Sequence, residues 1–116
     1  MAGHVPIGLH LHLRMLQARA ALAWRQGEAG QALMLRRSAL EFARTRFGEN
    51  GSEAASSRLA LAETLLLMGH AQPALEELHR AEPVLTRLQL AASPERRQLD
   101  GLMLLANSSL DDKKKQ

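Results

Sequence analysis

Hydrophobic residues recur at steps of three and four along most of the chain, and glycines interrupt this recurrence. The clearest example is the range 58–81. Its first part places on one helical face Leu59, Ala62, Leu65 and Leu66. Gly69 interrupts the pattern, which then resumes with Ala74, Leu75, Leu78 and Ala81. The range therefore predicts two amphipathic helices joined by a tight turn.

The same periodicity predicts five helices along the whole chain. Their expected ranges are 7–26, 30–47, 53–68, 71–92 and 94–110. We expect a single domain over residues 7–110. A flexible lead-in over residues 1–6 precedes it, and a disordered polar tail over residues 111–116 follows it.

Glycine, serine and proline mark where these helices begin and end. Gly27 and Gly69 are placed to end helices, because glycine adopts the left-handed conformation at little cost. Ser52 and Ser93 are expected to cap the N-termini of the third and fifth helices. Pro83 lies inside the fourth apolar pattern, so we expect it to kink that helix without breaking it.

The composition favours an all-α fold. Alanine and leucine dominate while valine, isoleucine and threonine are scarce, and the 116 residues suit one domain. There is no cysteine, which excludes disulfides and thiolate metal sites. No apolar run reaches the roughly 18 residues that span a bilayer, and the N-terminus lacks a secretory pattern. We therefore expect a cytoplasmic protein with no membrane partner.

The positive charge is concentrated in the first half of the chain. The net charge is +3, and residues 1–58 hold eight arginines against four glutamates. A basic half suits acidic partners or nucleic acid. Nucleic-acid binding by the Arg-rich first hairpin is therefore the alternative function. It is the less favoured one, because no aromatic residues interleave with the arginines as single-strand binding requires.

The chain repeats itself at the shift that carries Gly27 onto Gly69, which we call the repeat shift. The residues that coincide at this shift are Ala18 with Ala60, Ala20 with Ala62, Ala32 with Ala74, Leu33 with Leu75 and Ala39 with Ala81. Small residues let the two backbones of a helical hairpin approach closely. Each hairpin has apolar surface that it cannot bury alone, so the copies are expected to stack.

Two segments resemble the tetratricopeptide repeat (TPR) in its longer, kinesin-light-chain-like variety: LALAETLLLMGHAQPALEELHRA and ALEFARTRFGENGSEAASSRLA. The resemblance covers Leu9–Leu110 and implies an α-α superhelix of two antiparallel hairpins plus one terminal helix. Arg36 and Arg58 depart from it, since they occupy places where the family usually has an apolar residue. Such repeats often accompany bacterial signalling and regulatory proteins, so we expect a scaffold or adaptor, alone or within a larger chain.

In this family the first helix of each hairpin lines a concave groove that receives a peptide or a partner helix. Carried onto this chain, the resemblance predicts a groove lined by Arg14, Gln17, Ala21, Trp24, Arg25, Leu59, Glu63, Leu66, Leu67 and Leu105. Arg14 and Arg25 would hold an acidic side chain or a terminal carboxylate, and Trp24 an apolar anchor. The alternative is that Trp24 and the leucines are ordinary core residues.

No residue pattern indicates catalysis, a cofactor or a metal. His10 and His12 are two residues apart on a predicted helix and so point to nearly opposite sides. The serines are not placed in a strand-to-helix elbow, because no strand is predicted. The adjacent acids Glu76 and Glu77 are interpreted as part of a solvated face. We therefore expect a protein that is not an enzyme.

The stretch 102–106, LMLLA, is apolar all round a helix turn. A terminal helix that faces solvent should have a polar outer side. The helix is therefore expected to be covered by a following repeat or by a second copy of the chain. The residues predicted to carry a homodimer contact are Leu99, Leu102 and Met103.

Overall fold

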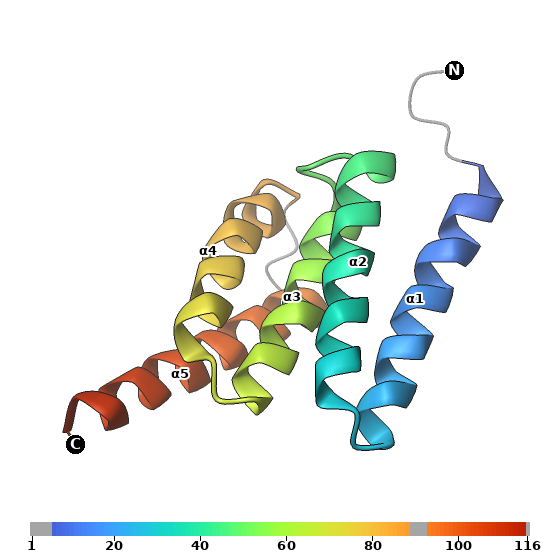
Figure 1. The fold of residues 1–116 in the computed structure, drawn as a ribbon. Coiled ribbons are helices and arrows are strands. Elements are labelled where there is room, and N and C mark those ends of the chain that lie inside the picture. The colour runs from blue at the N-terminus through green and yellow to red at the C-terminus, as the bar shows by residue number, and fades with distance from the viewer. Residues whose placement is uncertain (1–5, 89–92, 116) are drawn as a thin grey trace.

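The structure, a computed structural model, describes residues 6–88 and 93–115, and this part of the chain contains α-helices and no strand. Figure 1 shows the first four helices side by side and the last helix running obliquely across the lower part of this row. They are α1 (Ile7–Arg25), α2 (Ala29–Phe47), α3 (Ser52–Leu67), α4 (Ala71–Arg87) and α5 (Pro94–Lys115). The predicted all-α class with five helices is confirmed.

Successive helices pack against one another in antiparallel pairs. Helix α1 packs on α2, α2 on α3, α3 on α4, and α4 on α5, while α3 also reaches α5. In Figure 1, α1 forms the right-hand edge and α5 extends to the lower left. The molecule measures 54 × 34 × 20 Å along its principal axes. Such an elongated, layered body is what stacked helical hairpins produce.

The sequence repeat is visible in the backbone of the two hairpin turns. Gly27 and Gly69 both adopt positive φ angles, of 79° and 83°. The N–H of Glu28 donates to the carbonyl of Ala23 at 2.9 Å, and the N–H of His70 donates to that of Leu65 at 2.8 Å. Each of these bonds closes a Schellman motif, and the repeat shift carries the first motif onto the second. The predicted glycine stops are therefore confirmed at both turns.

The two predicted serine caps behave differently. The hydroxyl of Ser93 accepts a hydrogen bond from the N–H of Arg96 at 3.1 Å, which confirms this cap. The prediction for Ser52 is wrong, because Gly51 is the N-cap of α3 and makes no side-chain capping bond. Ser52 is instead the first helical residue, and its hydroxyl lies 3.3 Å from a carboxylate oxygen of Glu53. The repeat shift carries Gly51 onto Ser93, so the repeat itself places the cap of α3 at Gly51.

The helix boundaries differ from the expected ones mainly at the C-terminal side. Helix α4 continues through Pro83 without a break and ends at Arg87. The residues 89–92, which contain the predicted end of this helix, lie outside the described part. Helix α5 reaches Lys115, beyond the predicted end at Leu110. Of the lead-in only Pro6 is described, and it caps α1.

The core is built mainly from alanines and leucines. Ala20 and its repeat equivalent Ala62 are fully buried, and so is Ala74, the equivalent of Ala32. The largest fully buried side chains are Leu59, Leu61, Leu65, Leu78, Leu85 and Leu99. All of them lie on α3, α4 and α5, so the second half of the row holds most of the apolar core. A helix long and apolar enough to cross a membrane does not occur among the described residues.

Candidate functional site

Helices α1 and α3 face each other across a gap. Among the described helices, α1 packs its backbone only against α2, whereas α3 meets α2, α4 and α5. Two cavities lie in the space between α1 and α3. We call this space, with its two cavities, the α1–α3 groove.

The first cavity of the groove lies near the starts of α1 and α3 and has a volume of about 270 Å³. Its lining consists of His10, Leu13, Arg14, Gln17, Ser52, Glu53, Ser56, Leu85 and Glu95. Residues of α1, α3, α4 and α5 therefore meet here. Its charged groups are Arg14 on one wall and Glu53 and Glu95 on the other, so this end has both signs of charge.

The second cavity lies near the ends of α1 and α3 and has a volume of about 210 Å³. Its lining consists of Ala21, Trp24, Arg25, Arg36, Glu63, Thr64 and Leu67. Trp24 is half-buried, while Leu67 is 62 % exposed. An indole ring and an accessible leucine beside two guanidinium groups can receive an apolar side chain next to an acidic group.

Repeat equivalents stand on the two walls of the groove. Arg14 and Ser56 line the first cavity, and both Arg25 and Leu67 line the second. The members of each pair are related by the repeat shift, because α1 and α3 are the first helices of successive hairpins and run in parallel. The backbones of the two walls are therefore equivalent, but their side chains differ. In these two pairs an arginine on α1 corresponds to a smaller or apolar residue on α3.

The structure brings seven of the ten predicted groove residues to these two cavities. They are Arg14 and Gln17 in the first, and Ala21, Trp24, Arg25, Glu63 and Leu67 in the second. Leu59 is instead 1 % exposed and belongs to the core, and Leu66 is half-buried against it. Leu105 is exposed on α5 and lines neither cavity.

Arg36 is a groove residue that the sequence prediction did not include. It comes from α2 and is part of the lining of the second cavity. Burial lowers the pKa of Arg36 below its usual value, and the nearby charge of Glu63 opposes this shift only in part. A guanidinium group that has lost part of its hydration has more to gain from an incoming anion. The signal in the sequence was an arginine at a place where the tetratricopeptide repeat, which these segments resemble, usually has an apolar residue.

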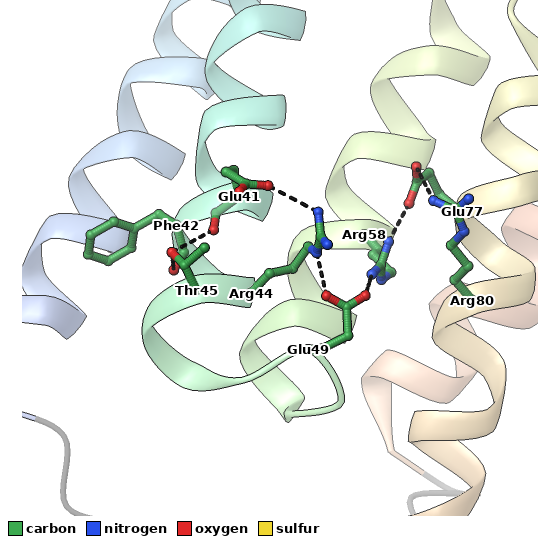
Figure 2. A network of polar contacts seen from close by, with 8 residues as sticks. All are labelled: Glu41, Phe42, Arg44, Thr45, Glu49, Arg58, Glu77 and Arg80. Carbon is green, nitrogen blue, oxygen red and sulfur yellow. Dashed lines mark hydrogen bonds and ion pairs between the residues drawn. The ribbon is translucent and has the colours of Figure 1, made fainter.

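A second polar feature connects α2, α3 and α4 away from the groove cavities, as shown in Figure 2. Its centre is Arg58, which is only 4 % exposed. The guanidinium of Arg58 donates to Glu77 at 2.8 Å and to Glu49 at 2.6 Å. Arg44 also pairs with Glu49, and Arg80 lies 3.8 Å from Glu77. We call these five residues the Arg58 network.

The Arg58 network corrects one prediction and supports a structural role. Glu77 was expected on a solvated face together with Glu76, but its side chain is only 14 % exposed and pairs with Arg58. The hydrogen bond from Arg44 lowers the pKa of Glu49 and so favours the ionised form of this carboxylate. The network joins α3 to α4 and to the loop after α2, which indicates that it positions the two hairpins.

The two N-terminal histidines pack on aromatic rings. The ring centroids of His10 and Phe47 are 4.8 Å apart, and those of His12 and Phe42 are 4.4 Å apart. Both phenyl rings belong to α2, so the histidines help to join α1 to α2. Within the described part of the chain, no three His, Asp or Glu side chains come close enough to hold a metal ion.

The residues predicted for self-association lie inside the molecule. Leu99 is fully buried, Leu102 is 6 % exposed, and Met103 packs against the core. As α5 is folded here, the two leucines have no surface to offer to a second copy, because they cover α3 and α4. The exposed leucines of α5 are Leu104 and Leu105.

Together the fold and the groove define the class of the protein: an all-α domain with a repeat-like, sequential packing of antiparallel helices. The chain matches no protein-family model, and no significant similarity to a curated protein or to a solved structure was found.

Proposed function

We propose that the chain is a TPR-like protein-interaction module that binds a segment of a partner protein in the α1–α3 groove. The observation that carries this proposal is the placement of two cavities along one gap between the first helices of successive hairpins. A pair of cavities in line suits an extended or helical segment that places one side chain in each of them.

The lining of the second cavity favours a partner segment with an apolar residue beside an acidic group. Trp24 and Leu67 offer apolar surface, while the guanidinium groups of Arg25 and Arg36 outnumber the one carboxylate of this lining, which belongs to Glu63. A carboxylate that accepts a bidentate hydrogen bond from arginine gains both strength and orientation. Because Arg36 is partly desolvated, such a contact should be stronger there than at a fully solvated arginine.

The ligand can be found by selection from a random peptide library displayed on phage, using the purified chain as bait. Trp24 is the only tryptophan, so its fluorescence reports directly on occupation of the second cavity. We expect the selected peptides to be rich in apolar and acidic residues and to change the emission of Trp24. We expect Arg25→Ala to weaken their binding by about tenfold, the usual loss for one hydrogen bond to a charged group.

Met34→Ala provides the matched control. Met34 is exposed on α2 and lines neither cavity, so this variant should bind the selected peptides as the wild type does. Peptides that bind equally well to a Trp24→Ala/Arg25→Ala double variant would contradict the proposal. Selective binding of an oligonucleotide, with an affinity that falls steeply as salt rises, would favour the nucleic-acid alternative instead.

A further inference from the structure

The two end helices of the row both expose apolar residues on their outer sides. On α1 the exposed residues are Ile7, Leu11, Met15 and Leu22. On α5 they are Leu104 and Leu105, which are 73 % and 61 % exposed. Contiguous apolar surface of this kind on a folded domain usually marks a contact site.

The residues of α1 form one continuous stripe. Successive steps of four, four and seven keep them on a single side of the helix, opposite the buried residues Leu13, Ala20 and Ala23. Arg14 and Arg19 are exposed on the two flanks of this stripe. Helix α1 contains three arginines and no acidic residue, so the charge of the helix that carries the stripe is positive.

The outer face of α5 has an open line between two exposed leucines, and the exposed charged residues beside it are mainly acidic. Gly101 and Ser108 are both exposed and lie two helical turns apart. Viewed down the helix axis, both project in directions between those of Leu104 and Leu105. A Cβ atom added to Gly101 would meet nothing within 4 Å, so no other part of the described chain covers the surface between the two leucines at this residue. The exposed charged residues beside this face are Asp100, Asp111 and Asp112 against Arg97, so acids predominate among the side chains that the structure describes on α5.

We propose that the chain assembles head to tail, with the outer face of α1 in one copy packed on the outer face of α5 in the next. The apolar stripe of α1 would lie along the open line between Leu104 and Leu105. Arg14 and Arg19 would then come near Asp111 and Asp112. The helices would then continue from copy to copy, as stacked helical repeats bury the apolar faces between neighbouring units.

A symmetric pairing of α1 with α1 is disfavoured. It would bring together the arginines of two helices that contain no acidic residue of their own, and like charges in contact weaken association. A contact between two different faces is heterologous and propagates. Arg14 belongs both to the first cavity and to a flank of the α1 stripe, whereas Trp24 and Leu67 of the second cavity lie outside both faces. The assembly can therefore be separated from peptide binding at the second cavity.

Sedimentation velocity over a concentration series tests the assembly. The sedimentation coefficient of the wild type should rise with concentration, because each copy retains a free face at either end. Met15→Glu blocks the α1 face and Leu104→Lys blocks the α5 face, so each variant alone should remain a monomer. An equimolar mixture of the two should form a dimer and nothing larger, because each partner contributes its one intact face.

Met34→Glu is the matched control, since Met34 is 60 % exposed against 62 % for Met15 but lies on α2. It should assemble like the wild type. Leu67→Lys should also assemble normally while losing peptide binding, which separates failure of this inference from failure of the proposed function. Leu11→Glu and Leu105→Lys repeat the test if circular dichroism shows that a first variant is unfolded.

Three results would overturn the inference. The first is a wild type that stays monomeric at every concentration. The second is a dimer that survives either single variant, or a mixture that yields no dimer. The third is binding of the monomeric wild type to phosphatidylserine vesicles that Met15→Glu abolishes, which would assign the α1 stripe to an anionic lipid surface.

Discussion

At the scale of the single residue, Arg58 is the side chain whose role differs most from its appearance in the sequence. An arginine near the middle of an amphipathic pattern suggests a polar edge. In the folded chain it is buried with its two guanidinium nitrogens on Glu49 and Glu77. A buried charge is tolerable only when it is paired and hydrogen-bonded, and these two carboxylates meet that need.

Removing Arg58 should therefore cost far more than its charge alone suggests. Arg58→Ala leaves Glu77 largely buried without its closest partner, and we expect a loss of about 3 kcal/mol in the free energy of unfolding. Urea denaturation followed by circular dichroism measures this loss. The double variant Arg58→Met/Glu77→Leu should recover most of it, because an apolar pair of similar volume needs no charge compensation.

Glu76→Ala is the control for this prediction. Glu76 is adjacent to Glu77 but exposed, so its removal should change the free energy of unfolding by less than about 0.5 kcal/mol. If Arg58→Ala were no more destabilising than Glu76→Ala, the Arg58 network would not hold the hairpins together.

At the scale of the element, the two hairpin turns are the same structure built twice. Their equivalent hydrogen bonds, from Glu28 to Ala23 and from His70 to Leu65, differ in length by no more than the scatter of such bonds. Each turn depends on a glycine with a positive φ angle, which is strained for any residue with a Cβ atom. The repeat therefore predicts that the same substitution at Gly27 and at Gly69 changes the free energy of unfolding by the same amount.

Gly27→Ala and Gly69→Ala should destabilise the protein by the same amount, about 1 kcal/mol, because alanine is strained in the left-handed region. A Cβ atom at either position meets nothing within 4 Å, so the cost comes from the backbone alone. Gly30→Ala, in the first turn of α2, should instead stabilise by about 0.5 kcal/mol. Thermal unfolding of the three variants measures these changes in stability. Unequal costs at Gly27 and Gly69 would contradict the equivalence of the turns.

The elements that the sequence predicted correctly are those that depend on local chemistry. Gly27 and Gly69 end helices, and Ser93 caps one, because the reason lies within a few residues of each. Glu77 and Leu102 were misjudged because their surroundings come from other helices. Nothing near Glu77 in the sequence indicates that Arg58 is packed against it, and the apolar turn around Leu102 does not say which side faces the core.

The groove was predictable in part for the same reason. The repeat shift places Arg14, Arg25 and Leu67 on first helices, and this level of prediction needs no structure. Arg36 escaped it because it reaches the second cavity from α2, and Leu59 was included although it packs into the core. Whether Arg36 reaches the cavity and whether Leu59 is covered both depend on the distance between α1 and α3, which is set by the tertiary packing.

At the scale of the whole molecule, the apolar core is divided unequally. The larger cluster spans the chain from Leu13 to Ala106 and is centred on α3 and α4. A smaller, separate cluster joins α1 to α2 through Ala20, Ala23, Ala32 and Leu35. Helix α1 also has α2 as its only backbone neighbour among the described helices. In a protein built of stacked hairpins, each unit is stabilised by its own packing and by its neighbours, so α1 should open most easily.

Native-state hydrogen exchange tests this order of stability. Amides of α1 should exchange faster than those of α3, and Leu35→Ala should speed exchange in α1 and α2 while leaving α4 unchanged. Leu78→Ala, which empties a fully buried site of the larger cluster, should cost about 3 kcal/mol and speed exchange in every helix. Equal protection of α1 and α3 would contradict the division of the core.

The order of stability also bears on the groove, because α1 is the less firmly packed of its two walls. A ligand held between Trp24 and Leu67 should therefore protect α1 more than α3, and the peptides selected for the groove provide the means to measure that difference.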